Sequence, residues 1–433
     1  MKLERAKGTR DFSPKEQMLR KYVMSKLSKV FELYGFSPLA TPIIERYDVL
    51  AAKFTAGEES DAMKEVFTFN DQGNRKLGLR YELTFPLARY IGMNQNTRMP
   101  FKRYQIGRVY RDGPIRLGRY REFWQCDVDI VGCNGIIADA EIIAVLKRGF
   151  KELDMDVTIE VNDRKLLNDI LSFAGINEEL REATLISIDK LKKVGPKGIA
   201  DELNSKGVSG DQIKKVIELI SVEGSNSEKL KLLQEKLGDT EGIIEITELF
   251  EWLNKFNVSF EFNPALARGL AYYTGPIFEV FLKGSEITSS FAGGGRWDKM
   301  IGNYLGTKEI VPATGVAFGL EPITEELKLR GFNTKESVTD VYVIPIGDTK
   351  QRAVQIVEDL RNSGIKSDLD LIGRNLSKNL DFANKMNIPY VVFIGEDEVK
   401  QNKIKLRDMN SGDENLVTLS EALKILNGDS DED

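Results

Sequence analysis

The sequence predicts an α+β protein with three kinds of unit: a domain built on an antiparallel sheet, a helical insertion within that domain, and a C-terminal α/β domain. Short runs of alternating polarity lie between Val66 and Asp129, and strand-like runs return from Ser259 to Leu320. Between them, residues 164–256 are rich in Lys, Glu, Leu and Ile, with glycines at helix-length intervals. From Val341 onward, strand and helix patterns alternate. A chain of 433 residues also exceeds the usual size of one domain.

The first predicted element is a helix that begins at residue 14. Ser13 and Glu16 form the two ends of a capping box, and Pro14 occupies the first helical position. Apolar residues then recur at helical spacing, and Gly35 provides a C-terminal stop. Residues 36–45 contain two prolines and are predicted to be extended.

The central predicted feature is a β-hairpin whose strands carry Arg111 and residues 118–121, joined by a loop at 112–117. Alternate positions of a strand share one face. One face therefore presents an aromatic ring, an amide and two carboxylates: Phe123, Gln125, Asp127 and Asp129. Glu82 and Thr84 are two positions apart at a predicted strand end and are expected to share a face as well. Another strand is predicted at 157–161.

Domain boundaries follow from these changes of pattern. The antiparallel-sheet domain is predicted to be discontinuous, over residues 1–163 and 257–327, with the helical insertion at 164–256. A charged linker is predicted at 328–338 and the α/β domain at 339–427, with Ser420 capping its last helix. The acidic tail at 428–433 has a composition typical of disorder.

The chain contains no histidine, which restricts its chemistry. Histidine is the usual general base near neutral pH and the commonest protein metal ligand. Its absence excludes a Ser-His-Asp triad, a Cys-His dyad and an H-E-x-x-H zinc site. The sequence also lacks a G-x-x-x-x-G-K-[ST] loop and a G-x-G-x-x-G between strand and helix, so nucleotide binding would require another kind of site.

The bulk composition, with 41% hydrophobic and 30% charged residues, is that of an ordinary globular protein. No apolar run is long enough to span a membrane, and the first residues lack the apolar core of a secretion signal. Two cysteines, Cys126 and Cys133, cannot build a disulfide framework or a complete zinc site. We therefore expect a cytoplasmic protein with no membrane association and no dedicated metal site.

A cationic stretch stands out against the net charge of −6. Between residues 98 and 121, Asp112 is the one acid, tyrosines are interleaved, and the basic residues are Arg98, Lys102, Arg103, Arg108, Arg111, Arg116, Arg119 and Arg121. A solvated surface usually mixes both signs of charge. The stretch therefore favours a local polyanion site, for nucleotide phosphates or an RNA end.

Four segments carry the candidate chemistry: LRYELT (79–84), residues 107–129, LARGLAYYTG (266–275), and AGGGRWD (292–298) with the GVAFGLE run (315–321) that follows it. Together they resemble the histidyl-tRNA synthetases, which are class II aminoacyl-tRNA synthetases. Residues 7–12 are similar to the N-terminal signature of that family, 35–45 to motif 1, 108–129 to motif 2 and 315–321 to motif 3. Segments 374–384 and 394–408 are similar to its anticodon-binding domain. The resemblance covers nearly the whole chain, and the RG-x-x-YY pattern is highly specific.

The resemblance implies activation of L-histidine by ATP to histidyl-adenylate, followed by transfer to the 3′ end of tRNA(His). It implies that the α-ammonium group of histidine is bound by Glu82, Thr84 and Gln125. The imidazole ring would be surrounded by Asp129, Tyr272 and Tyr273.

The resemblance also implies an ATP site made by Arg111, Phe123, Arg268 and Glu321. Arg111 and Arg268 would be the catalytic residues because they flank the α-phosphate, and Phe123 would stack on adenine. Arg116 is the candidate for contact with the tRNA acceptor end. Mg²⁺ would arrive with ATP, and motif 1 implies a homodimer.

Some positions depart from the family pattern. Pro322 occupies the place of the motif 3 arginine that packs on adenine, and proline cannot supply that cation-π contact. Ala271 replaces a more usual aspartate, and Asp112-Gly113 stands where a glutamate commonly follows the motif 2 arginine. Pro322 leaves open a catalytically silent paralogue that senses histidine or tRNA. A non-enzymatic RNA-binding protein is a further alternative, but it leaves RG-x-x-YY unexplained.

Overall fold

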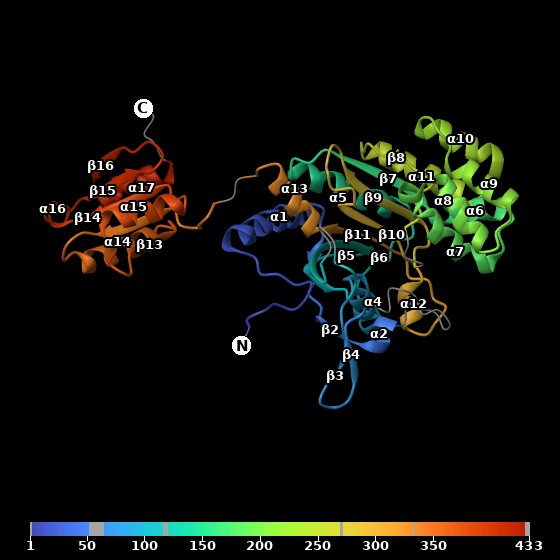
Figure 1. Cartoon of the computed structure of the whole chain (residues 1–433), viewed down its shortest axis with the longest axis horizontal. Coiled ribbons are helices and arrows are strands. Elements are labelled where there is room, and N and C mark those ends of the chain that lie inside the picture. The colour runs from blue at the N-terminus through green and yellow to red at the C-terminus, as the bar shows by residue number, and fades with distance from the viewer. Residues whose placement is uncertain (1, 52–64, 116–119, 269–271, 333–334, 429–433) are drawn as a thin grey trace. The chain divides into compact units, whose positions relative to one another are not determined.

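The computed structural model describes residues 2–51, 65–115, 120–268, 272–332 and 335–428 (Figure 1). The chain divides into two compact units. The larger contains Met1–Arg10 and Arg20–Gly331, and the smaller contains Asp11–Leu19 and Phe332–Asp433. Each unit has its own β-sheet.

The larger unit is built on an eight-stranded sheet, as the alternating runs predicted. Its strands in spatial order are β1 (Ser37–Pro38), β5 (Phe101–Tyr110), β6 (Glu122–Val131), β11 (Ala313–Gly319), β10 (Ala292–Arg296), β9 (Pro276–Leu282), β7 (Val157–Asp163) and β8 (Glu261–Phe262). The central pairs are antiparallel, and the outer pairs β1–β5 and β7–β8 are parallel. Segments almost two hundred residues apart, such as β6 and β11, therefore become neighbours.

One face of this sheet is covered by helices. The aromatic ring of Phe318 in β11 packs against Phe31 of α1 (Pro14–Leu33) and Phe150 of α5 (Ile137–Glu152), with ring centroids 5.6 and 5.4 Å apart. Helix α13 (Leu320–Leu329) follows β11 and packs on β6. Because side chains alternate along a strand, the residues on either side of Phe318 face away from these helices.

The predicted capping box of α1 is confirmed. The Glu16 carboxylate accepts hydrogen bonds from the Ser13 backbone N–H and hydroxyl at 3.0 and 3.1 Å. The Ser13 hydroxyl in turn accepts from the Glu16 N–H.

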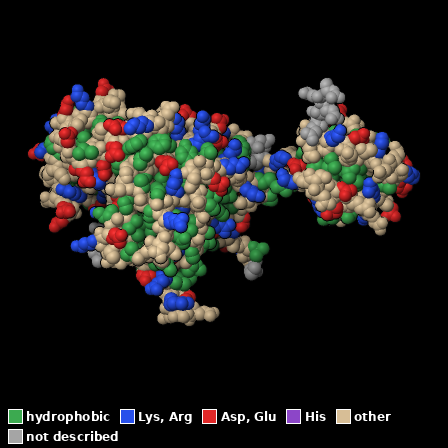
Figure 2. Space-filling model, turned by 180° about the vertical axis from the view of Figure 1, so that it is seen from behind, with side chains coloured by type: hydrophobic (Ala, Val, Ile, Leu, Met, Phe, Trp, Pro, Cys, Tyr) green, Lys and Arg blue, Asp and Glu red, His purple; other side chains and the backbone are tan. Residues whose placement is uncertain are grey.

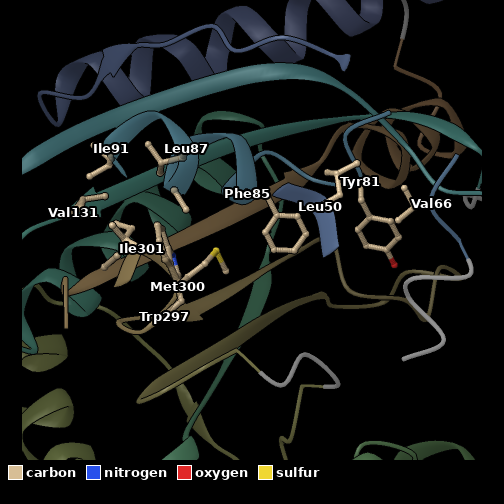
Figure 3. Packing of buried hydrophobic residues seen from close by; sticks show 12 residues of the cluster. Leu50, Val66, Tyr81, Phe85, Leu87, Ile91, Val131, Trp297, Met300 and Ile301 are labelled. Carbon is tan, nitrogen blue, oxygen red and sulfur yellow. The ribbon is translucent and has the colours of Figure 1, made fainter. Parts of the chain in front are cut away.

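A small three-stranded sheet and two short helices adjoin the large sheet. They are β2 (Ile44–Arg46), β4 (Lys76–Leu79), β3 (Thr68–Asn70), α2 (Tyr47–Ala51) and α12 (Met300–Tyr304). Together with α4 (Thr84–Met93) they enclose a hydrophobic cluster. Figure 3 shows Phe85 of this cluster between Trp297 and Met300 on one side and Tyr81 and Leu50 on the other.

Six helices fill residues 164–255 of the larger unit: α6 (Arg164–Phe173), α7 (Glu178–Ile188), α8 (Leu191–Ser205), α9 (Gly210–Ile220), α10 (Asn226–Leu237) and α11 (Glu241–Lys255). They form one group beside β7 and β8 (Figure 1). The helical character expected from the Lys-, Glu- and Leu-rich composition is thus present.

The smaller unit contains a five-stranded mixed sheet. Its order is β13 (Ser367–Leu369), β12 (Val341–Pro345), β14 (Tyr390–Ile394), β15 (Ile404–Asp408) and β16 (Glu414–Val417). The first three strands are parallel and the last two antiparallel to their neighbours. Its helices are α14 (Lys350–Asn362), α15 (Leu376–Lys385), α16 (Glu396–Lys400) and α17 (Leu419–Asn427).

Two local predictions were wrong. Glu82 and Thr84 do not share a strand face, because β4 ends at Leu79 and Thr84 begins helix α4. The apolar positions 85, 88 and 91 have helical spacing, and Pro86 is tolerated in a first helical turn. The last helix is capped by Thr418 rather than Ser420, since Thr418 has Glu421 three residues later and forms the capping box. None of the described helices has the length and apolar character needed to cross a bilayer.

Candidate active site

The face of the large sheet opposite to α1 and α5 forms the floor of a small cavity, beside the part of that face on which α4 packs. The side chains of Gln125, Asp127 and Asp129 in β6 line it together with Gly315 and Ala317 of β11. The register explains this arrangement, since Gln125 pairs with Gly319, Asp127 with Ala317 and Asp129 with Gly315. Small residues in β11 thus leave room above the polar side chains of β6.

The walls of the cavity bring together residues predicted from separate motifs. The histidine-site candidates Glu82, Thr84, Gln125, Asp129, Tyr272 and Tyr273 all line it, as do Arg111 and Arg268. The sequence did not single out Asp127, Trp297, Val316 and Ala317 as site residues, yet they line it too. Asp127 was recognisable by its alternation with Gln125 and Asp129, whereas Trp297 required knowledge of the fold.

Glycines of β10 and β11 allow the polar groups to approach the sheet. A Cβ atom at Gly293 would lie 1.5 Å from Nη1 of Arg268, and one at Gly315 would lie 2.0 Å from Oδ1 of Asp129. A Cβ at Gly294 would meet the carbonyl oxygen of Gly315 at 2.0 Å. The triple glycine therefore creates space for ligand-facing side chains and for close strand packing.

Several buried oxygen atoms of the cavity lack a hydrogen-bond donor among the residues that the structure describes. They are Oε1 of Glu82, Oε1 of Gln125 and Oδ1 of Asp127. Buried polar atoms are normally hydrogen-bonded, and a buried polar atom left without a hydrogen bond costs roughly 1–3 kcal/mol of stability. Three such acceptors in one cavity indicate a ligand that carries several N–H donors.

The two aspartates of the cavity floor have shifted acidities. Burial raises the pKa of Asp129 to about 6, although the neighbouring Arg103 opposes this shift. Burial also raises the pKa of Asp127 well above its usual range, again against the effect of Arg103. At pH 7 Asp129 is therefore largely ionised and able to accept hydrogen bonds.

Two arginines provide fixed positive charge at the cavity. Arg111 donates from Nε to the carbonyl oxygen of Tyr81 at 3.3 Å, and its guanidinium lies 4.2 Å from the Tyr81 ring and 5.0 Å from the Phe123 ring. Arg268 pairs with Glu279, with Nη1 and Oε1 3.4 Å apart. Burial acts to lower the pKa of Arg268, but Tyr273 and Glu279 outweigh it and raise the pKa overall.

The paired tyrosines form the aromatic side of the cavity. The rings of Tyr272 and Tyr273 have centroids 4.6 Å apart. Burial raises the pKa of both phenols, so each remains a hydrogen-bond donor at neutral pH.

Other predicted residues lie elsewhere or cannot be placed. The ring of Phe123 contacts the Arg111 guanidinium without lining the cavity. The Glu321 carboxylate is buried, paired with Arg20 at 2.9 Å, and accepts from the Trp124 N–H at 3.0 Å. Its predicted part in ATP binding stays a prediction. Arg116 and Ala271 lie outside the described residues.

The cationic stretch at 98–121 is not one continuous anion site. Lys102 pairs with Glu141 at 2.9 Å, Arg121 with Asp112 at 2.9 Å, and Arg103 is buried against Asp129 at 2.7 Å. Of the described basic residues in this stretch, Arg111 alone lines the cavity. Figure 2 likewise shows lysines and arginines interspersed with acids on the surface it presents. Among the described residues, the predicted polyanion site is therefore reduced to Arg111.

The antiparallel sheet, the cavity of acceptors and the flanking arginines define a protein that binds an amino acid beside an anionic group, as an aminoacyl-tRNA synthetase does. Residues 8–323 match the family model for histidyl-tRNA synthetase, and residues 340–428 match that for an anticodon-binding domain. The chain belongs to the histidyl-tRNA synthetase family, and its activity is that of a histidine–tRNA ligase.

Individual relatives match over the full length. The chain is 40% identical to histidine–tRNA ligase 1 of Bacillus cereus, over 98% of this chain and 100% of the relative. It is 38% identical to histidine–tRNA ligase 2 of Shouchella clausii, over 96% and 98%. The solved histidyl-tRNA synthetase of Nostoc sp. PCC 7120 superposes with a TM-score of 0.86 at 29% identity, over 99% and 100%. None of these similarities favours the catalytically silent paralogue.

Proposed function

We propose that the cavity binds histidine with its α-ammonium group toward Glu82, Thr84 and Gln125 and its imidazole toward Asp129. An ammonium group has three donors, which suits the unpartnered oxygens of Glu82 and Gln125. Neutral imidazole offers one N–H donor and one nitrogen acceptor, which a carboxylate and a phenol of Tyr272 or Tyr273 can match. A site with buried partners for a ring N–H would reject analogues that lack it by on the order of 10⁴ or more.

In the activation step, an oxygen of the histidine carboxylate attacks the α-phosphorus of ATP, and the bond to the β-phosphate oxygen breaks. Pyrophosphate leaves and histidyl-adenylate remains. Arg111 and Arg268 would neutralise the charge that develops on the α-phosphate oxygens. The attacking carboxylate is already ionised, so no general base is required and a chain without histidine can carry out the step.

For ATP itself, we assign adenine stacking to Phe123. Glu321 would support this contact indirectly, because its carboxylate accepts a hydrogen bond from the backbone N–H of Trp124, the residue after Phe123. The described residues provide no cluster of three or more cysteines or carboxylates able to hold a metal ion. Mg²⁺ would accompany ATP and neutralise the phosphate oxygens, which are among its preferred ligands.

In the transfer step, a ribose hydroxyl at the 3′ end of tRNA(His) attacks the activated carbonyl carbon, and AMP leaves. The acceptor-end contact is assigned to Arg116, and anticodon recognition to the unit that contains β12 to β16. The catalytic domain is assigned to the class II type. A cytoplasmic homodimer formed through the motif 1 segment, residues 35–45, completes the proposal.

The convergence of unpartnered buried oxygens opposite two arginines carries this assignment. Its test is amino-acid-dependent exchange between ATP and pyrophosphate, with histidine compared against the other standard amino acids. We expect exchange with histidine alone. Histidine binding by calorimetry without any exchange would instead indicate a sensor, and would overturn the assignment of Arg111 and Arg268.

A further inference from the structure

Arg103 lies beside Asp129 of the proposed histidine cavity and has no place in the mechanism above. Its side chain is fully buried, with 0% of its surface exposed, and Nη2 is 2.7 Å from Oδ2 of Asp129, whose side chain is 3% exposed. Arg103 and Asp129 are cross-strand partners in the pairing of β5 with β6. The contact is therefore built into the register of the sheet rather than dependent on a mobile side chain.

The same guanidinium also contacts the segment that carries Glu82 and Thr84. Nη2 of Arg103 also donates to the carbonyl oxygen of Leu83 at 3.2 Å. Leu83 stands between Glu82 and Thr84, the residues assigned to the α-ammonium group. One cation thus joins the segment that binds one end of the substrate to the aspartate that binds the other.

Stability alone does not account for this arrangement. Nε and Nη1 of Arg103 are buried without a hydrogen-bond acceptor among the described residues, and Oδ2 of Asp129 makes the ion pair without hydrogen-bond geometry. Burying a guanidinium in this way is costly, and apolar replacements of buried ion pairs are often neutral or stabilising. A costly group next to a ligand cavity points to a role in binding.

We propose that Arg103 is a specificity-determining positioning residue, which keeps the Asp129 carboxylate ionised and aimed at the substrate ring while it fixes the Glu82–Thr84 segment. This inference rests on the proposed roles of Asp129 and Glu82. Arg103 does not touch the reacting atoms, so its removal affects histidine binding rather than ATP binding.

The charges around Asp129 support this role. Burial and the Glu82 carboxylate raise its pKa, whereas Arg103 and the Trp297 indole lower it. Asp127 on the same strand is also buried and is affected by Arg103 in the same direction, with Arg111 contributing further. Without Arg103, the pKa of Asp129 rises further, and less of it is ionised at neutral pH. A protonated Asp129 is a poorer acceptor for the imidazole N–H, and raising the pH restores it.

The test compares Arg103→Met and Arg103→Lys with wild type in histidine-dependent pyrophosphate exchange from pH 6 to 9. For Arg103→Met we expect the KM for histidine to rise about 10- to 100-fold at pH 7, as for a lost hydrogen bond to a charged group. The KM for ATP should change little, the defect should shrink toward pH 9, and Arg103→Lys should be intermediate. Equal increases in both KM values, or a wild-type KM for histidine, would overturn the inference.

A matched control separates positioning from folding. Arg296 and Asp139 form another buried ion pair, 2.5 Å apart, and neither residue lines the cavity. Arg296→Lys should lower the thermal midpoint without a selective rise in the KM for histidine. In addition, Asp129→Asn with Arg103→Lys should be no worse than Asp129→Asn alone, because lysine can still donate to the Leu83 carbonyl and the remaining effect of Arg103 acts through Asp129. Additive losses would contradict this. Absence of exchange by wild type, or a normal KM in Asp129→Asn, would identify failure of the proposed function instead.

Discussion

In the ligand-free chain the Asp129 carboxylate occupies a buried position on β6, where burial raises its pKa from 3.8 to about 6. Compared with the unfolded state, the folded state therefore binds the proton of Asp129 more tightly. The stability that this preference contributes is complete below pH 3.8 and is lost as the pH rises through about 6. In the proposed site, the ionised Asp129 carboxylate accepts hydrogen bonds from histidine at neutral pH. The same ionisation lowers the free energy of unfolding of the protein without ligand.

Asp129→Asn should remove this pH-dependent loss. The difference in unfolding free energy between the variant and wild type should change by up to about 3 kcal/mol in favour of the variant as the pH rises from 4 to 7, because the pKa change is about two units. Urea unfolding of both ligand-free proteins at several pH values measures the difference. The KM for histidine should rise in the same variant. A stability difference that stays constant with pH would contradict the prediction.

Pro322 stands where the family resemblance places the arginine of motif 3. It is the third residue of α13, and its ring lies against Gly319, close to where a Cβ atom of that glycine would stand. Pro322→Arg would add a cation at the end of β11, beside the strand that carries Phe123. We expect the KM for ATP to fall about 2- to 30-fold, the range of a cation-π contact with the adenine ring.

Pro322→Ala is the matched variant for this change, because it removes the ring without adding charge. Its KM for ATP should remain at the wild-type value. A similar fall in both variants would show that loss of the proline ring, rather than the new cation, is responsible.

At the residue level, the family resemblance named candidate site residues in separate segments, and the roles of these residues stay predictions. Glu82, Gln125, Asp129, Tyr273 and the two arginines were predicted separately, and they meet in one cavity. Arg103 was interpreted as part of a surface for anions. Its burial depends on the register between β5 and β6, which no local pattern reveals.

At the scale of elements, strand β10 gives the active site its shape. Its glycine run lies between β9 and β11, and Gly293 leaves space that the Arg268 guanidinium fills. The clash of a Cβ there would be with a flexible side chain rather than with backbone. A small side chain at Gly293 is therefore expected to displace Arg268 without disrupting the sheet.

Gly293→Ala should accordingly lower kcat in pyrophosphate exchange by about 10²- to 10³-fold, as for loss of one group that stabilises transition-state charge. Gly210→Ala is the control, since a Cβ at Gly210 meets nothing within 4 Å and should leave kcat unchanged. Thermal unfolding checks that both variants are folded. A wild-type kcat for Gly293→Ala would show that Arg268 is not needed at this position.

Elements were predictable where their signals are local. The capping box at Ser13 placed the start of α1 correctly, and the strand-helix alternation after residue 340 matched the smaller unit. The order of the large sheet was not predictable, because β6 pairs with β11 across a stretch of chain that includes all six helices of residues 164–255. Helix α4 was interpreted as strand since its short apolar run fits either period.

At the scale of the whole molecule, the absence of histidine is compatible with every role that the site requires. In the proposed site, carboxylates and phenols face the substrate ring, arginines face the phosphate, and the attacking group needs no base. Ion pairs elsewhere are formed by lysine or arginine, as in the buried pairs of Arg20 with Glu321 and Arg296 with Asp139. Neither fold nor chemistry therefore requires histidine, and translation of this chain consumes none of its own product.

We therefore expect synthesis of this protein to continue when charged tRNA(His) is scarce. The test is a variant with histidine at exposed positions that make no side-chain hydrogen bond described in the structure: Gln95→His, Gln401→His and Asn410→His. In a histidine auxotroph, the abundance of the variant should fall below that of wild type under histidine limitation and equal it when histidine is abundant. The purified proteins should have the same exchange activity and the same thermal midpoint, since none of the three positions lines the cavity. Equal abundance under limitation would refute the idea, and would leave the missing histidines without a role in expression.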